Sequence, residues 1–254
     1  MIAAATAVHA LALLGGLAVA LAALELLAAR HAWRADGVFA WATMRGRLAT
    51  SPAPVRALLD ATLDDRGFTA LLAGLVGGGL ALAWVPHPAL ACAVAVLQLG
   101  VSVRFGGSFN GGSDAMLLVV VIGVALARAV SAPLGLGYVA AQLVLSYGIA
   151  GIVKLRVRGW RDGTALAQLL TAPPYRVAPC VLRLIGRRHV ALAASWLVIT
   201  LECGFPAALV APELAIALLV GAGAFHVGNA LVLGLNRFVW AWLAAYPALL
   251  YWVR

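Results

Sequence analysis

Long apolar runs, separated by connections that carry most of the arginines, constrain the fold of this chain more than any other feature. Of its 254 residues, 64% are hydrophobic and 11% are charged, whereas a soluble domain has roughly 25% charged residues. A helix needs about 20 mostly apolar residues to cross a bilayer, and eight runs approach that length. The sequence therefore predicts an all-α polytopic integral membrane protein, with one transmembrane domain over residues 1–254 and the lipid bilayer as its surroundings.

The runs and their connections give a coarse map of the chain. Pro54 opens a stretch with apolar residues at helical spacing, which predicts a helix lying on the membrane surface. A second short helix is predicted over residues 162–170, and a loop over residues 104–114, where four glycines stand among Ser, Asn and Asp. The predicted membrane spans are residues 5–29, 68–85, 89–103, 115–130, 134–154, 191–210, 213–235 and 238–253.

The positive charges predict which connections share a side of the membrane. The chain has 18 Lys and Arg residues, and if alternate connections share a side, all but Arg128 and Arg254 fall on one side. Cytoplasmic loops carry an excess of cations, so this side is predicted to be cytoplasmic and both termini outside. We expect no nucleic-acid partner, because the cations lie between apolar runs and follow no nucleic-acid motif. No cation precedes the first run, which predicts a retained span rather than a cleaved signal. Aromatic residues bracket the last run and predict an interfacial belt: Trp240, Trp242, Tyr246, Tyr251 and Trp252.

Lys154 is the only lysine in the chain, and it stands at the end of the fifth apolar run. Arginine stays protonated at any attainable pH, whereas a lysine can lose its proton and act as a base. Two interpretations are open at this point. The ammonium group either reaches the lipid headgroups as an anchor, or it handles protons in a polar cavity inside the membrane.

Other polar side chains inside the runs are candidates for function, because ionisable groups are costly there. Glu202 lies within the apolar stretch SWLVITLECGFP, and His226 and Asn229 are three residues apart, so they share one helical face. Glu202 and His226 either pair with each other or line a polar cavity together with Lys154. Asp114 is predicted to be a helix N-cap or a functional group.

Two further observations limit the chemistry. Gln98 and Glu25 are interpreted as ordinary hydrogen-bond partners between helices. No His–Glu spacing typical of a zinc site occurs, and three cysteines show no ligand or disulfide pattern: Cys92, Cys180 and Cys203. The sequence therefore predicts no metal.

Four segments in this order, YGIAGIVKL, WRDGTAL, TLECGFP and FHVGN, resemble the HTTM family, the membrane domain shared with vitamin K-dependent gamma-carboxylase. The upstream segment FNGGSDAMLL is similar to an Asn–Gly–Asp segment of that family, with Ser113 interrupting the tighter pattern. The resemblance covers most of the chain, from about Phe68 onward.

The resemblance implies a site and a cofactor. Lys154 would be the base that deprotonates vitamin K hydroquinone or menaquinol, with His226 and Glu202 as its catalytic partners. Four more residues would bind the reduced quinone: Asn229, Trp160, Asn110 and Asp114. It also implies quinol-dependent carboxylase-like or oxygenase-like chemistry in a bacterial cytoplasmic membrane, with a thiol–disulfide oxidoreductase as a partner.

A second interpretation is a non-enzymatic membrane partner in the maturation or immunity of a secreted peptide. The carboxylase carries a large soluble domain that binds its peptide substrate, and this sequence ends soon after its last apolar run. We therefore expect a short bacterial-type member of the family, without peptide carboxylation.

Overall fold

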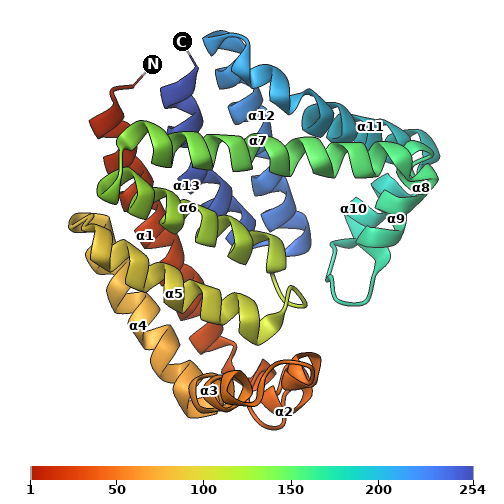
Figure 1. Ribbon diagram of the computed structural model, residues 1–254. Helices are drawn as coiled ribbons and strands as arrows, with labels where there is room; N and C mark the ends of the chain where they lie inside the picture. Colours follow the sequence, from red (N-terminus) through yellow and green to blue (C-terminus); the bar gives the residue numbers. More distant parts are fainter. Residues whose placement is uncertain (1, 254) are drawn as a thin grey trace. The chain divides into compact units, whose positions relative to one another are not determined.

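The computed structural model describes residues 2–253, and within that range it is helical with no β-strand (Figure 1). The described chain comprises two compact units, one formed by residues 4–136 and the other mainly by residues 137–253. Its elements are α1 (Ala4–Ala28), η1 (Arg30–Ala32), α2 (Trp41–Met44), η2 (Arg45–Leu48), α3 (Ala53–Leu63), α4 (Asp65–Trp84), α5 (Pro88–Phe105), α6 (Gly111–Ala129), α7 (Ala132–Arg156), α8 (Arg158–Arg161), α9 (Thr164–Thr171), α10 (Pro179–Ile185), α11 (Arg188–Gly204), η3 (Phe205–Leu209), α12 (Pro212–Leu233) and α13 (Asn236–Trp252).

Seven helices within the described range are long and apolar enough to cross a membrane: α1, α4, α5, α6, α7, α11 with its continuation η3, and α12. This finding confirms the prediction of an all-α polytopic membrane protein. The eighth predicted span corresponds to α13, which has 17 residues and so lies at the short end of the roughly 17–25 residues that a spanning helix needs.

In the unit of residues 4–136, four long helices pack around one another. Helix α1 contacts α4 and α6, α4 contacts α5, and α5 contacts α6. Helices α1 and α4 approach each other closely, because a Cβ atom on Gly16 would collide with the backbone of Gly79 and Ala83. Because only glycine leaves room for that backbone contact, Gly16 sets the distance between these two helices.

Arg104, in the last turn of α5, ties the connection between α1 and α4 to this bundle. Its side chain is fully buried, and it donates hydrogen bonds to the carbonyl oxygens of Phe39 (2.9 Å) and Trp33 (2.8 Å). The guanidinium carbon also lies 5.2 Å from the centre of the Phe68 ring and 5.3 Å from that of Trp41. Arg104 is thus a buried structural cation held by carbonyl groups and aromatic faces.

The glycine-rich segment is shorter as a loop than the sequence predicts. Helix α5 extends to Phe105 and helix α6 already begins at Gly111, so the loop predicted over residues 104–114 is wrong at both ends. The N-cap residue is Asn110, with a left-handed backbone at φ 52°. Asp114 lies in the first turn of α6, so its predicted N-cap position is also wrong. Its carbonyl oxygen accepts a hydrogen bond from Gln98 Nε2 at 3.3 Å, which confirms Gln98 as a link between helices.

The unit of residues 137–253 combines long helices with three short ones, α8, α9 and α10, that follow the end of α7 (Figure 1). Helix α11 contacts all three short helices, while α12 packs against α13 and η3. An apolar cluster joins α9 and α10 to the start of α11: Leu170, Val177, Ile185 and Ala191. Helix α9 confirms the short helix predicted over residues 162–170.

The aromatic belt predicted around the last run is wrong in two of its members. Trp242 and Tyr246 are buried, whereas Trp240 and Trp252 are 45% and 46% exposed. Phe238, Trp242 and Tyr246 stand at intervals of four residues, so they form a stripe along one face of α13. This stripe faces the interior of the unit and contributes to the site described next.

Candidate functional site

A pocket of about 580 Å³ lies within the unit of residues 137–253. Its walls are mostly apolar and come from each of the helices α7 to α13. Five of the seven site residues proposed from the sequence line it: Lys154, Trp160, Glu202, His226 and Asn229. The other two, Asn110 and Asp114, belong to the other compact unit. The structure thus gathers residues from four separate helical segments into one cavity.

The strongest polar contact in the pocket is an ion pair between Lys154 and Glu202. Lys154 Nζ lies 2.8 Å from Glu202 Oε1 and 2.7 Å from Oε2, and the two side chains are 18% and 5% exposed. The ammonium group also lies 5.2 Å from the centre of the Trp160 ring. Lys154 therefore points to a carboxylate and an aromatic face inside the unit, which the anchor interpretation does not predict.

Gly151 explains why Lys154 can reach Glu202. A Cβ atom at Gly151 would lie 2.5 Å from the backbone nitrogen of Cys203 and 2.8 Å from the carbonyl carbon of Glu202. Helices α7 and α11 therefore touch backbone to backbone at this position. Lys154 follows Gly151 by three residues and lies on the same face of α7, so the close crossing places the ammonium group beside the carboxylate.

His226 has a different partner from the one that the sequence suggested. Its Nε2 lies 2.7 Å from the hydroxyl oxygen of Tyr147, which itself lies 3.4 Å from the hydroxyl oxygen of Tyr246. The pairing of His226 with Glu202 is therefore not formed, because each side chain is engaged elsewhere. The second ring nitrogen, Nδ1, is buried and has no hydrogen-bond partner among residues 2–253.

Aromatic rings fix the orientation of this histidine. The imidazole lies 5.0 Å from the ring of Trp242, and Phe238 stacks on Trp242 at the same distance. Tyr147 is held in turn by stacking on Phe205, with 4.0 Å between the ring centres. Rings packed in this way leave His226 few rotamers, so both nitrogen positions are preorganised.

The segment WRDGT forms the turn that presents Trp160. Gly163 has a left-handed backbone at φ 83°, and a Cβ atom there would lie 2.8 Å from the backbone nitrogen of Leu192, so a side chain would push the turn away from α11. Asp162 Oδ1 accepts hydrogen bonds from the backbone nitrogen (3.0 Å) and the hydroxyl group (2.6 Å) of Thr164. These two bonds hold the pKa of the Asp162 carboxyl below its usual range.

Side chains of α11 fasten this turn from the other side. The hydroxyl group of Ser195 donates to the carbonyl oxygen of Trp160, and the indole N–H of Trp196 donates to the carbonyl oxygen of Arg161 at 3.1 Å. The turn is therefore held at its backbone, which fixes where the Trp160 ring meets Lys154.

Sequence reasoning missed several residues of the pocket. Tyr147 bears the hydroxyl that bonds His226, and Phe238 and Trp242 form its aromatic wall. The four-residue spacing along α13 and the seven-residue spacing from Tyr147 to Lys154 were available signals, since both place residues on one helical face. Leu166 and Leu169 of α9 also line the pocket, but nothing in their sequence pattern distinguishes them from ordinary core residues.

Comparison with known proteins adds no relative. No protein-family model, no curated protein and no solved structure matches this chain. The resemblance to the HTTM family therefore stays a prediction that rests on the four sequence segments quoted above.

Proposed function

We propose that this chain is an HTTM-type membrane enzyme that binds a reduced quinone, such as menaquinol or vitamin K hydroquinone, in the pocket of residues 137–253. The observation that carries the proposal is the Lys154–Glu202 ion pair beside a preorganised histidine in a mostly apolar cavity. Apolar pockets with a few convergent polar groups are the usual form of small-molecule sites.

The residues present fit such a ligand. The apolar walls suit a prenylated aromatic ring. The buried Nδ1 of His226 has no hydrogen-bond partner in the described part of the chain, and a ligand hydroxyl or carbonyl oxygen can supply one. Asn229 lies one helical turn after His226 on the same wall and offers both a donor and an acceptor. When bound, the reduced quinone supplies reducing electrons and an acidic hydroxyl group.

The ion pair gives Lys154 a route to act as a base. A proton can pass from Nζ to the Glu202 carboxylate along their 2.7 Å contact, because the pair has no net charge before or after this transfer and a low-dielectric pocket disfavours separated ions. The neutral Nζ then accepts a proton from the hydroxyl group of the ligand. Glu202 ends protonated, and the Lys154 ammonium faces the oxygen atom that lost its proton.

The wider setting follows from the same proposal. We place the protein in a bacterial cytoplasmic membrane with both termini outside, supported by the distribution of arginines. A thiol–disulfide oxidoreductase is the partner class that would regenerate a reduced quinone. A secreted peptide as partner is the alternative, and under it the pocket would hold no quinone.

Binding of a menaquinol analogue to the purified protein tests the proposal, with wild type beside Lys154→Ala, Glu202→Gln and His226→Ala. We expect saturable binding that is about tenfold weaker in His226→Ala, which loses one buried hydrogen bond. Leu231→Ala is the control, since Leu231 is exposed and does not line the pocket. Quinol-dependent oxygen consumption should disappear in Lys154→Ala and Glu202→Gln. Absence of binding in the wild type would contradict the proposal and favour the peptide-partner alternative.

A further inference from the structure

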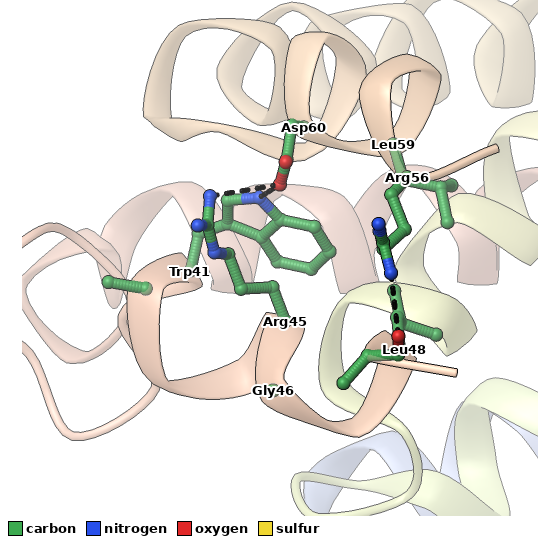
Figure 2. A pocket seen from close by; sticks show the side chains of 9 residues that line it. Trp41, Arg45, Gly46, Leu48, Arg56, Leu59 and Asp60 are labelled. Carbon is green, nitrogen blue, oxygen red and sulfur yellow. Dashed lines mark hydrogen bonds and ion pairs between the residues drawn. The ribbon is translucent and has the colours of Figure 1, made fainter. Parts of the chain in front are cut away.

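A second pocket, of about 380 Å³, lies in the unit of residues 4–136, between the segment of α2 and η2 and the helix α3. Trp41 and Arg45 contribute to it from one side, and Arg56, Leu59 and Asp60 from the other. In the view of Figure 2, the Trp41 indole lies between the side chains of Arg45 and Arg56. The residues of this pocket take no part in the function proposed above.

The charges of this pocket do not cancel. Arg45 Nη1 lies 3.4 Å from Asp60 Oδ1, and the same oxygen accepts the indole N–H of Trp41 at 2.8 Å. Arg56 donates to the carbonyl oxygen of Ala49 at 2.6 Å (Figure 2). The pocket therefore holds two arginines and one carboxylate, and each guanidinium has five N–H donors, most of which these contacts leave for an anion.

Neighbouring pockets of the same unit lack this surplus of positive charge. The one lined by Arg34 and Arg66 also contains Asp36 and Asp65, so its charges balance. The one lined by Arg66, Asp64 and Asp65 is negative. An anion is therefore favoured in the Arg45–Arg56 pocket over these two neighbours.

The exposed apolar side chains of α3 indicate which class of anion the pocket binds. Val55 and Leu58 are 43% and 63% exposed, and Pro54 and Ala61 lie on the same side of the helix. Arg56 and Asp60 lie on the side turned to α2 and η2 and line the pocket, and Leu59, which also lines it, stands between Arg56 and Val55 around the helix. An amphipathic helix of this kind lies in the membrane interface with its apolar side chains at the acyl boundary, which brings its arginine to the level of the lipid phosphates.

We propose that the pocket formed by Trp41, Arg45 and Arg56 binds the phosphate headgroup of an anionic phospholipid, with the lipid chains lying along Val55 and Leu58. The two guanidinium groups supply charge-assisted hydrogen bonds to the phosphate oxygens. The exposed apolar side chains of α3 contact the lipid chains. A free anion such as inorganic phosphate has no chains and cannot make this contact. The lipid thereby joins α3 to the segment of α2 and η2.

Binding of dioctanoyl phosphatidylglycerol to the full-length protein in detergent tests this site, with dioctanoyl phosphatidylcholine and inorganic phosphate as comparison probes. A basic residue near the membrane surface strengthens binding of anionic lipid about fivefold. We expect Arg45→Gln and Arg56→Gln each to lose about that much affinity. Arg30→Gln is the matched control, because Arg30 is an exposed arginine of the same connection that does not line the pocket.

Asp60→Asn is expected to strengthen lipid binding, and a misfolded variant would not bind the lipid more tightly. The substitution removes the competing carboxylate but keeps an oxygen for the Trp41 N–H, so phosphatidylglycerol should bind several-fold more tightly. The proposal is wrong if the two lipids bind alike, if Arg30→Gln loses as much affinity as the pocket variants, or if Asp60→Asn does not strengthen binding. Inorganic phosphate binding as tightly as the lipid would also overturn it, since α3 would then contribute nothing.

Discussion

Lys154 and Glu202 form a contact in which the loss of a single side chain has a large energetic consequence. Removing one partner of a buried pair leaves an uncompensated charge, whereas replacing both by apolar residues is often neutral. We therefore expect Lys154→Ala to lower the free energy of unfolding by about 3 kcal/mol. The double variant Lys154→Met with Glu202→Leu should stay within about 1 kcal/mol of the wild type. Denaturant titration in detergent micelles measures both.

The double-variant comparison also separates stability from chemistry. If the pair only holds α7 against α11, the double variant should keep the pocket and still bind a quinol analogue. If Lys154→Ala were as stable as the wild type, the two side chains would not be paired in the membrane, and the proton route through Glu202 would have to be abandoned.

The types of site residue could be predicted from the sequence, but their pairing could not. Ionisable groups in apolar runs are rare enough to mark Lys154, Glu202 and His226 as candidates. Which of them meet depends on how the helices cross, and that is set by Gly151 and by the aromatic packing around Tyr147. Neither contact leaves a local signal in the sequence. The Glu202–His226 pair therefore stood as one of two open interpretations, and the structure does not form it.

At the scale of elements, the crossing of α7 and α11 is the feature on which the pocket depends. We expect Gly151→Ala to force the two backbones apart, because its Cβ atom would meet the backbone at Cys203 and Glu202. Overpacking of this kind costs about 1–3 kcal/mol, and the displaced Lys154 should weaken ligand binding about tenfold.

Gly223→Ala is the matched control for this crossing. No atom lies within 4 Å of a Cβ built at Gly223, and alanine favours a helix over glycine by about 1 kcal/mol. This variant should therefore bind ligand like the wild type and be at least as stable. Equal behaviour of the two glycine variants would show that the close crossing does not position Lys154.

Arg104 makes a second element-scale prediction, in the other unit. Arg104→Ala leaves two carbonyl groups without their donor and opens a gap among aromatic rings, so we expect a loss of about 3 kcal/mol in the free energy of unfolding. Arg104→Lys keeps the charge but lacks the planar fork that reaches Trp33 and Phe39 together, and should recover less than half of that loss. Limited proteolysis should cut residues 29–47 faster in both variants, whereas equal cleavage would contradict this role.

Long elements were predictable because their apolar runs are continuous, whereas the short helices α8 and α10 were not predicted. Helices α8 and α10 have four and seven residues, too few for a periodic pattern to distinguish them from a polar connection. Gly111 and Gly112 suggested a loop but begin α6, where the apolar residues that follow outweigh the poor helix propensity of glycine. Tertiary burial also decides the place of Arg104, which the sequence assigns to a loop.

At the scale of the whole molecule, the positive charges predict the membrane topology of the chain. The positive-inside rule predicts that residues 157–187 face the cytoplasm and the short connection at Ser131 faces outward. In a variant whose only cysteine is Cys180, which is exposed in α10, an impermeant maleimide should label inverted vesicles alone. A variant whose only cysteine is Ser131→Cys should be labelled only in right-side-out vesicles.

The same labelling decides whether α13 crosses the membrane. A single cysteine in a tag after residue 254 should be labelled from the outside if α13 is an eighth span, and from the inside if α13 lies within the protein or along the interface. We expect outside labelling, because α13 has 17 mostly apolar residues, which is long enough to cross a bilayer. Inside labelling would leave seven crossings and place Arg254 on the cytoplasmic side. Reversed labelling of Cys180 would be more serious, since the arginine asymmetry would then predict the wrong orientation for the whole chain.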